Sequence, residues 1–186
     1  MSPTVDEPSN QPAGYGVSND EMRGRLLKAS WFLVAYELLK GDVIGRPQQL
    51  FRTGFKDGKA VLGPQYEVEV RSLAEHPFDA SLVWLQKKGA LSSAEAEDVQ
   101  RIREYRNDVA HNLFGLLMSR GEPLDLPLLE LTATLIAKLG RFWARQPLPG
   151  FDPAPASMPD SEVYSSTMFI IGYFAQVAGL TPTVDK

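Results

Sequence analysis

The sequence predicts an all-α protein, a helical bundle of four to five main helices. Apolar residues recur at intervals of three and four over several stretches of helical length, and capping residues, glycine or proline separate these stretches. The chain has 186 residues, 44% of them hydrophobic and 23% charged, which suffices for one domain with a buried core. No internal repeat is visible.

Composition excludes several classes of function. The chain has no cysteine, and its two histidines, His76 and His111, lie in no metal-binding spacing, so we expect no metal and no cofactor. The net charge of -4 gives no global basic field for nucleic acid. Residues 1–10 do not resemble a signal peptide, and the apolar stretch 168–180 is shorter than the roughly 20 residues that span a bilayer. We therefore expect a cytoplasmic protein without a membrane contact.

The first helix of the bundle begins near residue 19. Residues 1–18 are rich in Pro, Ser, Asn and Gly, which predicts a disordered tail. Ser18 is a suitable N-cap, acidic residues follow in the first turn, and the apolar spacing continues to a glycine at Gly41 that predicts the helix end.

Residues 45–70 interrupt the pattern and predict a small irregular or hairpin insertion. A short helix at 47–52 and a hairpin across Asp57-Gly58 both fit the glycine and proline spacing. The stretch 66–73 alternates as a strand would, but a helix fits it as well. Both alternatives stay open at this point.

Three more helices complete the predicted bundle, which covers 19–146. One starts at Pro77 and ends at Gly89. The next opens with a capping box, Ser92 and Glu95, and continues to about residues 120–121. A third covers 126–146.

Two further segments follow the bundle. Residues 147–160 form a Pro-rich connector. Residues 161–180 predict a C-terminal helix that packs on the bundle or on a dimer partner, with aromatic residues that we interpret as packing residues: Tyr164, Phe169, Tyr173 and Phe174. The three tryptophans predict core or interface positions in the same way, and they are Trp31, Trp84 and Trp143.

The helix from Ser92 carries a polar cluster on the side opposite its apolar stripe. Asn107 and His111 lie one turn apart, about 160° and 200° around the helix from Val109. Phe114 and Met118 follow His111 at helical spacing and predict a second buried surface, which we expect to be a homodimer interface. The apolar stripe itself consists of Val99, Ile102, Tyr105, Val109, Leu113 and Leu116.

The run RNDVAH at 106–111 resembles the R-x4-6-H motif of HEPN-domain proteins, in the form with Asn after the Arg and Ala before the His. The resemblance covers about residues 92–120 firmly and 20–146 loosely. It implies a HEPN-like all-α bundle that is active as a dimer. Many members of that family are metal-independent ribonucleases, and they act as toxins of toxin–antitoxin pairs or as antiphage effectors.

The residue types of this run suit metal-free RNA cleavage by the ribose 2'-OH. His111 can move protons near neutral pH, and Arg106 presents paired donors to phosphate oxygens. Asn107 can orient the imidazole or hold a phosphate oxygen, and Arg103 and Arg101 are candidate RNA ligands. One chain offers one suitable histidine, whereas a dimer offers two, which could divide the roles of base and acid.

The resemblance has one departure and one alternative. In HEPN toxins that are modified by a nucleotidyltransferase antitoxin, a tyrosine stands two residues after the histidine, and here that position is Leu113. RNA is the expected substrate, and a cognate antitoxin or a defence-system protein is a further candidate partner. The alternative function is a catalytically inactive HEPN-like binding or regulatory module. His76 precedes Pro77 and predicts a loop or helix N-terminal residue.

Overall fold

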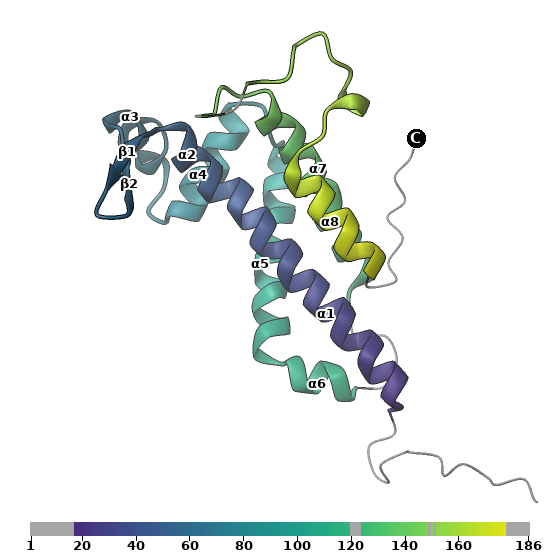
Figure 1. Ribbon diagram of the computed structural model, residues 1–186. Coiled ribbons are helices and arrows are strands. Elements are labelled where there is room, and N and C mark those ends of the chain that lie inside the picture. The colour runs from purple at the N-terminus through teal and green to yellow at the C-terminus, as the bar shows by residue number, and fades with distance from the viewer. Residues whose placement is uncertain (1–16, 120–123, 149, 151, 178–186) are drawn as a thin grey trace, which may run out of the picture.

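The computed structural model describes residues 17–119, 124–148, 150 and 152–177, and it is mainly helical (Figure 1). Residues 1–16 of the expected tail, the expected helix end at residues 120–121 and residues 178–180 lie outside the described residues. Two short 3-10 turns accompany the main elements, Arg71–Leu73 and Asp160–Glu162. The main elements are α1 (Asn19–Lys40), α2 (Arg46–Leu50), β1 (Arg52–Lys56), β2 (Lys59–Leu62), α3 (Pro64–Glu69), α4 (Pro77–Lys87), α5 (Ser93–His111), α6 (Leu113–Met118), α7 (Leu126–Ala144) and α8 (Ser166–Val177).

Helix α1 begins and ends where the sequence predicts, but the chain stays helical beyond its end. Ser18 caps it: its hydroxyl accepts a hydrogen bond from the Glu21 amide at 3.2 Å, and the Glu21 carboxylate accepts one from the Ser18 amide at 2.8 Å. The α-helix ends at Lys40 with Gly41 as its C-cap, as predicted, but Gly41 keeps right-handed helical angles and a π-helical turn, Gly41–Gly45, leads directly into α2. The chain stays helical through Gly41 because the residues on both sides of Gly41 belong to the core: Leu39 and Val43 are both fully buried.

The insertion contains both of the elements that the sequence left open. The short helix α2 is followed by the hairpin of β1 and β2, whose turn has positive φ at Asp57 (52°) and Gly58 (73°), as a two-residue hairpin turn requires. The stretch 66–73 is helical rather than extended. Tyr66 and Val70 are buried one turn apart, so burial on one side selects the helix.

Helix α5 starts at its predicted capping box and ends earlier than predicted. The Ser92 hydroxyl and the Glu95 amide are 3.3 Å apart, and the Glu95 carboxylate accepts from the Ser92 amide at 2.7 Å. The prediction of one continuous helix to about 120 is wrong. Asn112 leaves helical geometry (φ -117°, ψ 26°), and α6 then runs at a steep angle to α5, beneath α1 (Figure 1). The Asn112 side chain lies where a Cβ on Gly115 would be, so the two residues pack at the bend.

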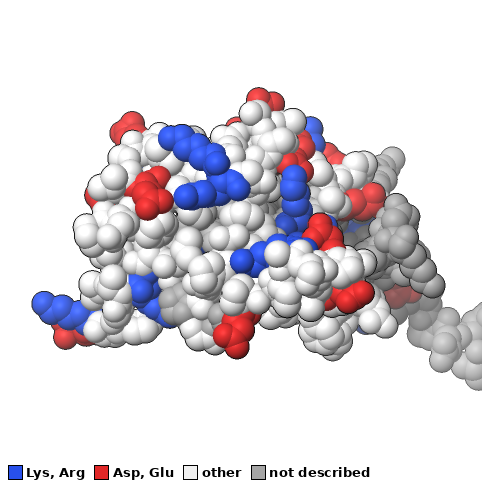
Figure 2. Space-filling view, turned by 90° about the horizontal axis from the view of Figure 1, so that it is seen from above, with Lys and Arg blue, Asp and Glu red and all other residues white. Residues whose placement is uncertain are grey.

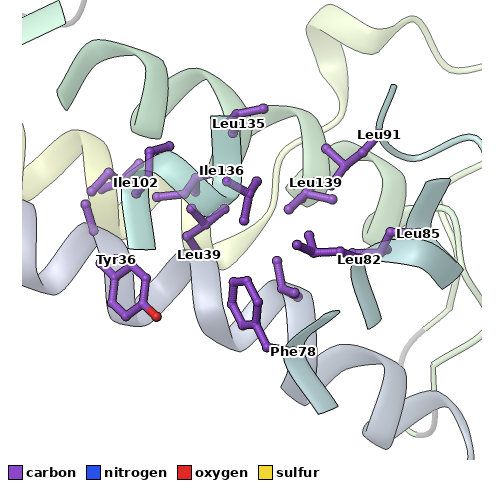
Figure 3. Packing of buried hydrophobic residues seen from close by; sticks show 14 of the residues in the cluster. Tyr36, Leu39, Phe78, Leu82, Leu85, Leu91, Ile102, Leu135, Ile136 and Leu139 are labelled. Atoms are coloured by element: carbon purple, nitrogen blue, oxygen red, sulfur yellow. The ribbon is translucent and has the colours of Figure 1, made fainter. Parts of the chain in front are cut away.

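The core lies between α1, α4, α5 and α7 (Figure 3). Trp84 and Trp143 stack with ring centroids 6.0 Å apart, and Trp31 is also buried, so the tryptophans belong to the core. The Trp143 indole donates to the Asp42 carbonyl oxygen at 3.0 Å, which ties α7 to the π-helical turn. The cluster drawn in Figure 3 includes Tyr36, Leu39, Phe78, Leu82, Leu85, Leu91, Ile102, Leu135, Ile136 and Leu139.

The last helix starts later than predicted, at Ser166 instead of residue 161, because the connector ends in a 3-10 turn that Arg145 holds through the Met158 carbonyl oxygen at 2.9 Å. Helix α8 lies close to α7 at Gly140, where an added Cβ would run into Ser165. The aromatic residues are exposed in the single chain, so their packing on a dimer partner stays a prediction. Their exposed fractions are 76% for Tyr164, 79% for Phe169, 60% for Tyr173 and 38% for Phe174. No helix in the described ranges is both long and apolar enough to cross a membrane.

Candidate functional site

The three motif residues lie on the last two turns of α5. The opposite side of this helix is fixed in the core, so the motif side is turned outward: Arg106 is half-buried, and Asn107 and His111 are exposed. The buried residues that fix this rotation are Ala96, Val99, Ile102 and Val109.

Arg106 is held against α1. Its guanidinium lies over the Tyr36 ring, 5.4 Å from the centroid, and its Nη2 is 3.3 Å from the Glu37 Oε1. Its Nη1 donates to the Asn107 Oδ1 at 3.4 Å. The Arg106 Nε is buried, and within the described part of the chain it has no acceptor. The guanidinium is therefore fixed in place, while one of its donors pairs with a carboxylate and one nitrogen keeps an unused donor.

His111 is the last residue of α5, and its side chain is exposed. No described residue hydrogen-bonds its imidazole, so both ring nitrogens are available for a hydrogen bond to a substrate. Asn107 lies one turn earlier on the same side, about 40° away. An exposed imidazole and an amide therefore lie on one side of the end of α5, and the fixed Arg106 guanidinium lies about 140° around the helix from His111, against α1.

The two candidate RNA ligands lie in different surroundings. Arg103 contacts α4: its guanidinium lies 4.8 Å from the Phe78 ring centroid and its Nη1 is 3.5 Å from the Asp79 Oδ1. It shares the motif side of α5, at about 60° from Arg106. Arg101 pairs with Asp98 at 3.1 Å and is well exposed, about 15 Å along the helix axis from His111. The structure therefore places Arg103 beside the motif and Arg101 apart from it.

Helix α6 presents the two residues expected at the dimer interface. Phe114 is 74% exposed, and Met118 is half-buried. A side chain from α1 holds this helix: the Arg25 guanidinium donates to the Leu117 carbonyl oxygen at 2.8 Å and also to that of Ser119. These two contacts satisfy carbonyl groups at the end of α6 that have no partner within the helix. The orientation of Phe114 thus depends on a residue of α1.

The electrostatic surroundings of the motif are balanced. Glu37 and Asp79 offset the charges of Arg106 and Arg103. On the face of the molecule seen from above, which is not the motif end of α5, basic and acidic side chains are also interspersed (Figure 2). The described residues contain no cluster of three or more His, Cys, Asp or Glu that could hold a metal ion. His76 is the N-cap of α4 and is exposed, in agreement with its interpretation as a helix N-terminal residue.

Sequence reasoning missed three residues that position the motif, all of them on α1. Tyr36 and Glu37 hold Arg106, and Arg25 holds α6. The contact between Glu37 and Arg106 joins residues 69 positions apart, so no local pattern could reveal it. Arg25 gave a weak signal, since it is a charged residue beside the apolar positions of an amphipathic helix.

Comparison of the chain with family models, with curated proteins and with solved structures finds no match.

Proposed function

We propose that this protein is a metal-independent endoribonuclease that cleaves RNA by attack of the 2'-OH at a composite site between two subunits, as a toxin or antiphage effector. The observation that supports this most is the joint arrangement of a fixed Arg106 with an exposed Asn107 and His111 at the end of α5. These are the residues of the HEPN-like motif, and each is accessible to an RNA strand lying along α5.

Each residue would have a distinct role. His111 of one subunit would remove the 2'-OH proton, and His111 of the second would protonate the leaving 5'-oxygen. Arg106 would neutralise the phosphorane, with donors that stay charged at all physiological pH values. Asn107 would orient either the imidazole or a phosphate oxygen, and Arg103 would hold the backbone of the RNA beyond the scissile phosphate.

The experiment compares His111→Ala and Arg106→Ala with wild type for RNA cleavage, with His76→Ala as the matched control. His76 is the other histidine of the chain, exposed and with no side-chain capping bond. We expect the two motif variants to lose about 10²–10⁴-fold in rate. The melting temperature of His111→Ala should stay near that of wild type, because the side chain is exposed. Equal cleavage by His111→Ala and wild type would contradict the proposal.

The second candidate is a catalytically inactive HEPN-like binding or regulatory module. The Arg106–Glu37 ion pair favours this inactive module, because Glu37 occupies a guanidinium donor that a phosphate would need. RNA cleavage by the Glu37→Gln variant distinguishes the ribonuclease from the inactive module. A ribonuclease should cleave at least as well when this competing carboxylate is neutralised, whereas a module shows no cleavage in wild type or variant and keeps its partner binding in His111→Ala.

A further inference from the structure

A groove next to the motif is lined by the end of α1, the π-helical turn, α2, the hairpin and the start of α8. Its volume is about 530 Å³, within the range of about 300–1,000 Å³ that is typical of small-molecule sites. We call it the Asp42 groove. Glu37 lines it and also holds Arg106, so the groove and the motif share a wall. Its polar lining comprises Glu37, Asp42, Arg46, Gln48, Gln49, Arg52 and Thr167.

Asp42 is a buried carboxylate with an unused oxygen. The residue is 3% exposed, and one of its oxygens lies 3.5 Å from the Arg46 Nε. The other, Oδ2, has no hydrogen-bond donor among the described residues. A buried acceptor without a donor is destabilising, and because Oδ2 is closed to solvent, a donor in the groove would reach it once the Asp42 side chain turns toward the groove that the residue lines. π-Helical turns, such as the one that carries Asp42, are frequent at functional sites.

Two glycines keep the groove open. Gly41 and Gly45 line it one turn apart, both with helical backbone angles. No described atom comes within 4 Å of a Cβ built on either residue, so the fold itself does not require glycine there. Glycine inside a helix costs about 0.5–1 kcal/mol relative to alanine. The two glycines therefore lower the stability of the helix but leave the space above them in the groove open.

Arg52 supplies a cation at the hairpin side of the groove. Its guanidinium stacks on the Phe55 ring, 4.7 Å from the centroid, and in the described ranges it has no carboxylate partner. Arg46, by contrast, is already engaged by Asp42 and by Gln49 at 3.2 Å. The groove therefore combines one available cation with one unused buried acceptor, which suits a ligand that carries an anionic group at one end and a hydrogen-bond donor at the other.

We propose that the Asp42 groove binds one nucleotide of the RNA substrate, with its phosphate on Arg52 and the donor edge of its base on Asp42. The inference rests on the proposed ribonuclease function for its choice of ligand. A nucleotide has both required groups, and its sugar and base would cover the apolar part of the lining, Leu38 and Ala60. The shared wall at Glu37 would place this nucleotide on the strand that continues to Arg106.

The test measures binding of nucleoside 5'-monophosphates by titration calorimetry, beside the unphosphorylated nucleosides and inorganic phosphate alone. We expect the nucleotides to bind more tightly than either fragment. Gly45→Leu should fill the groove and weaken nucleotide binding at least about tenfold, the equivalent of about 1.4 kcal/mol. Gly24→Leu is the matched control, since Gly24 is also a helix glycine without a described atom near its Cβ, and it should bind like wild type.

A second pair of variants tests the phosphate contact. Arg52→Ala should weaken nucleotide binding at least about tenfold and leave nucleoside binding unchanged, because the variant loses the charged donor that holds the phosphate. Lys56→Ala, at the exposed far end of β1, should change neither. Failure of wild type to bind any nucleotide, or equal binding by Gly45→Leu and wild type, would overturn the inference.

RNA cleavage by the same variants separates the two proposals. If wild type binds nucleotides, Gly45→Leu abolishes that binding, and neither protein cleaves RNA, then the nucleotide site in the groove is supported and the proposed ribonuclease function is contradicted. If wild type and Gly45→Leu cleave RNA with the same KM, then the proposed ribonuclease function is supported and the nucleotide site in the groove is contradicted.

Discussion

Asp42 carries a carboxyl group whose buried surroundings disfavour its charged form. Burial raises the pKa of its carboxyl from 3.8 to about 6, although the Arg46 guanidinium opposes the shift. A carboxyl whose pKa is higher in the folded state favours folding when it is protonated. This contribution is fully present below the unfolded-state pKa, near 3.8, and is lost as the pH rises through about 6.

Asp42→Asn should therefore change the pH dependence of stability. We expect the free energy of unfolding of wild type, relative to the variant, to fall by up to about 3 kcal/mol between pH 4 and pH 7, since one pKa unit corresponds to about 1.4 kcal/mol. Urea denaturation of both proteins at several pH values measures this difference. The comparison cancels the other carboxyl groups, such as Glu95, whose pKa is lowered mainly by its hydrogen bond from Lys138. A constant difference across the range would contradict the burial of a charged Asp42.

Helical periodicity predicted which motif residues face outward, but not what they touch. It placed Asn107 and His111 opposite Val109, and both are exposed while Val109 is fully buried. The contacts of Arg106 with Tyr36 and Glu37 depend on how two helices cross. Such contacts form between residues distant in the chain and leave no trace in local spacing.

The helix starts were easier to predict than the helix ends. The capping boxes at Ser18 and Ser92 have a sequence signature because both partners lie within four residues of each other. Gly41 is the C-cap of α1, but the chain continues as a π-helical turn, because burial of the residues on either side favours helix. Asn112 did end α5, because α6 is bonded to α1 through Arg25. Both outcomes depend on tertiary contacts rather than on propensity.

Helix α6 should lose its stability when its contact with α1 is removed. Arg25→Met keeps the aliphatic length of the side chain but removes the hydrogen bonds to the end of α6. We expect amide hydrogen exchange in 113–118 to accelerate strongly, whereas exchange in the core of α7 should change little, because six residues form a helix only when they are held in place. Arg23→Met, an exposed change on the same helix, is the control. Unchanged protection of α6 in Arg25→Met would show that Arg25 does not hold it.

At the scale of the whole molecule, several large apolar side chains remain uncovered within the described residues, and two of these surfaces bear on a dimer. One is Phe114 on α6, close in sequence to the motif, and the other is the aromatic face of α8 that includes Phe169 and Tyr173. Large exposed apolar patches mark interaction surfaces in soluble proteins. The composite site that we propose requires the surface at Phe114 to be the one shared by two subunits.

Phe114→Glu should therefore convert a dimer into monomers and leave the fold intact, because this side chain is exposed in the isolated chain and buried charges disfavour an interface core. Sedimentation measures the mass, and circular dichroism measures the helix content. Phe169→Glu introduces the same charge on α8 and should leave the dimer unchanged. Dissociation by Phe169→Glu with no effect of Phe114→Glu would place the interface on α8 and contradict a composite site at α5 and α6.

The most direct test of the central claim is cleavage of one RNA oligonucleotide by the wild-type protein in EDTA, beside the same oligonucleotide with a single deoxyribose at the cleaved position. We predict cleavage of the all-ribose strand in the chelator, products with 2',3'-cyclic phosphate ends, and no cleavage at the deoxyribose, because the nucleophile is the 2'-OH. Cleavage that stops in EDTA and returns with Mg²⁺, or that proceeds at the deoxyribose, would contradict a metal-independent ribonuclease built on Arg106 and His111.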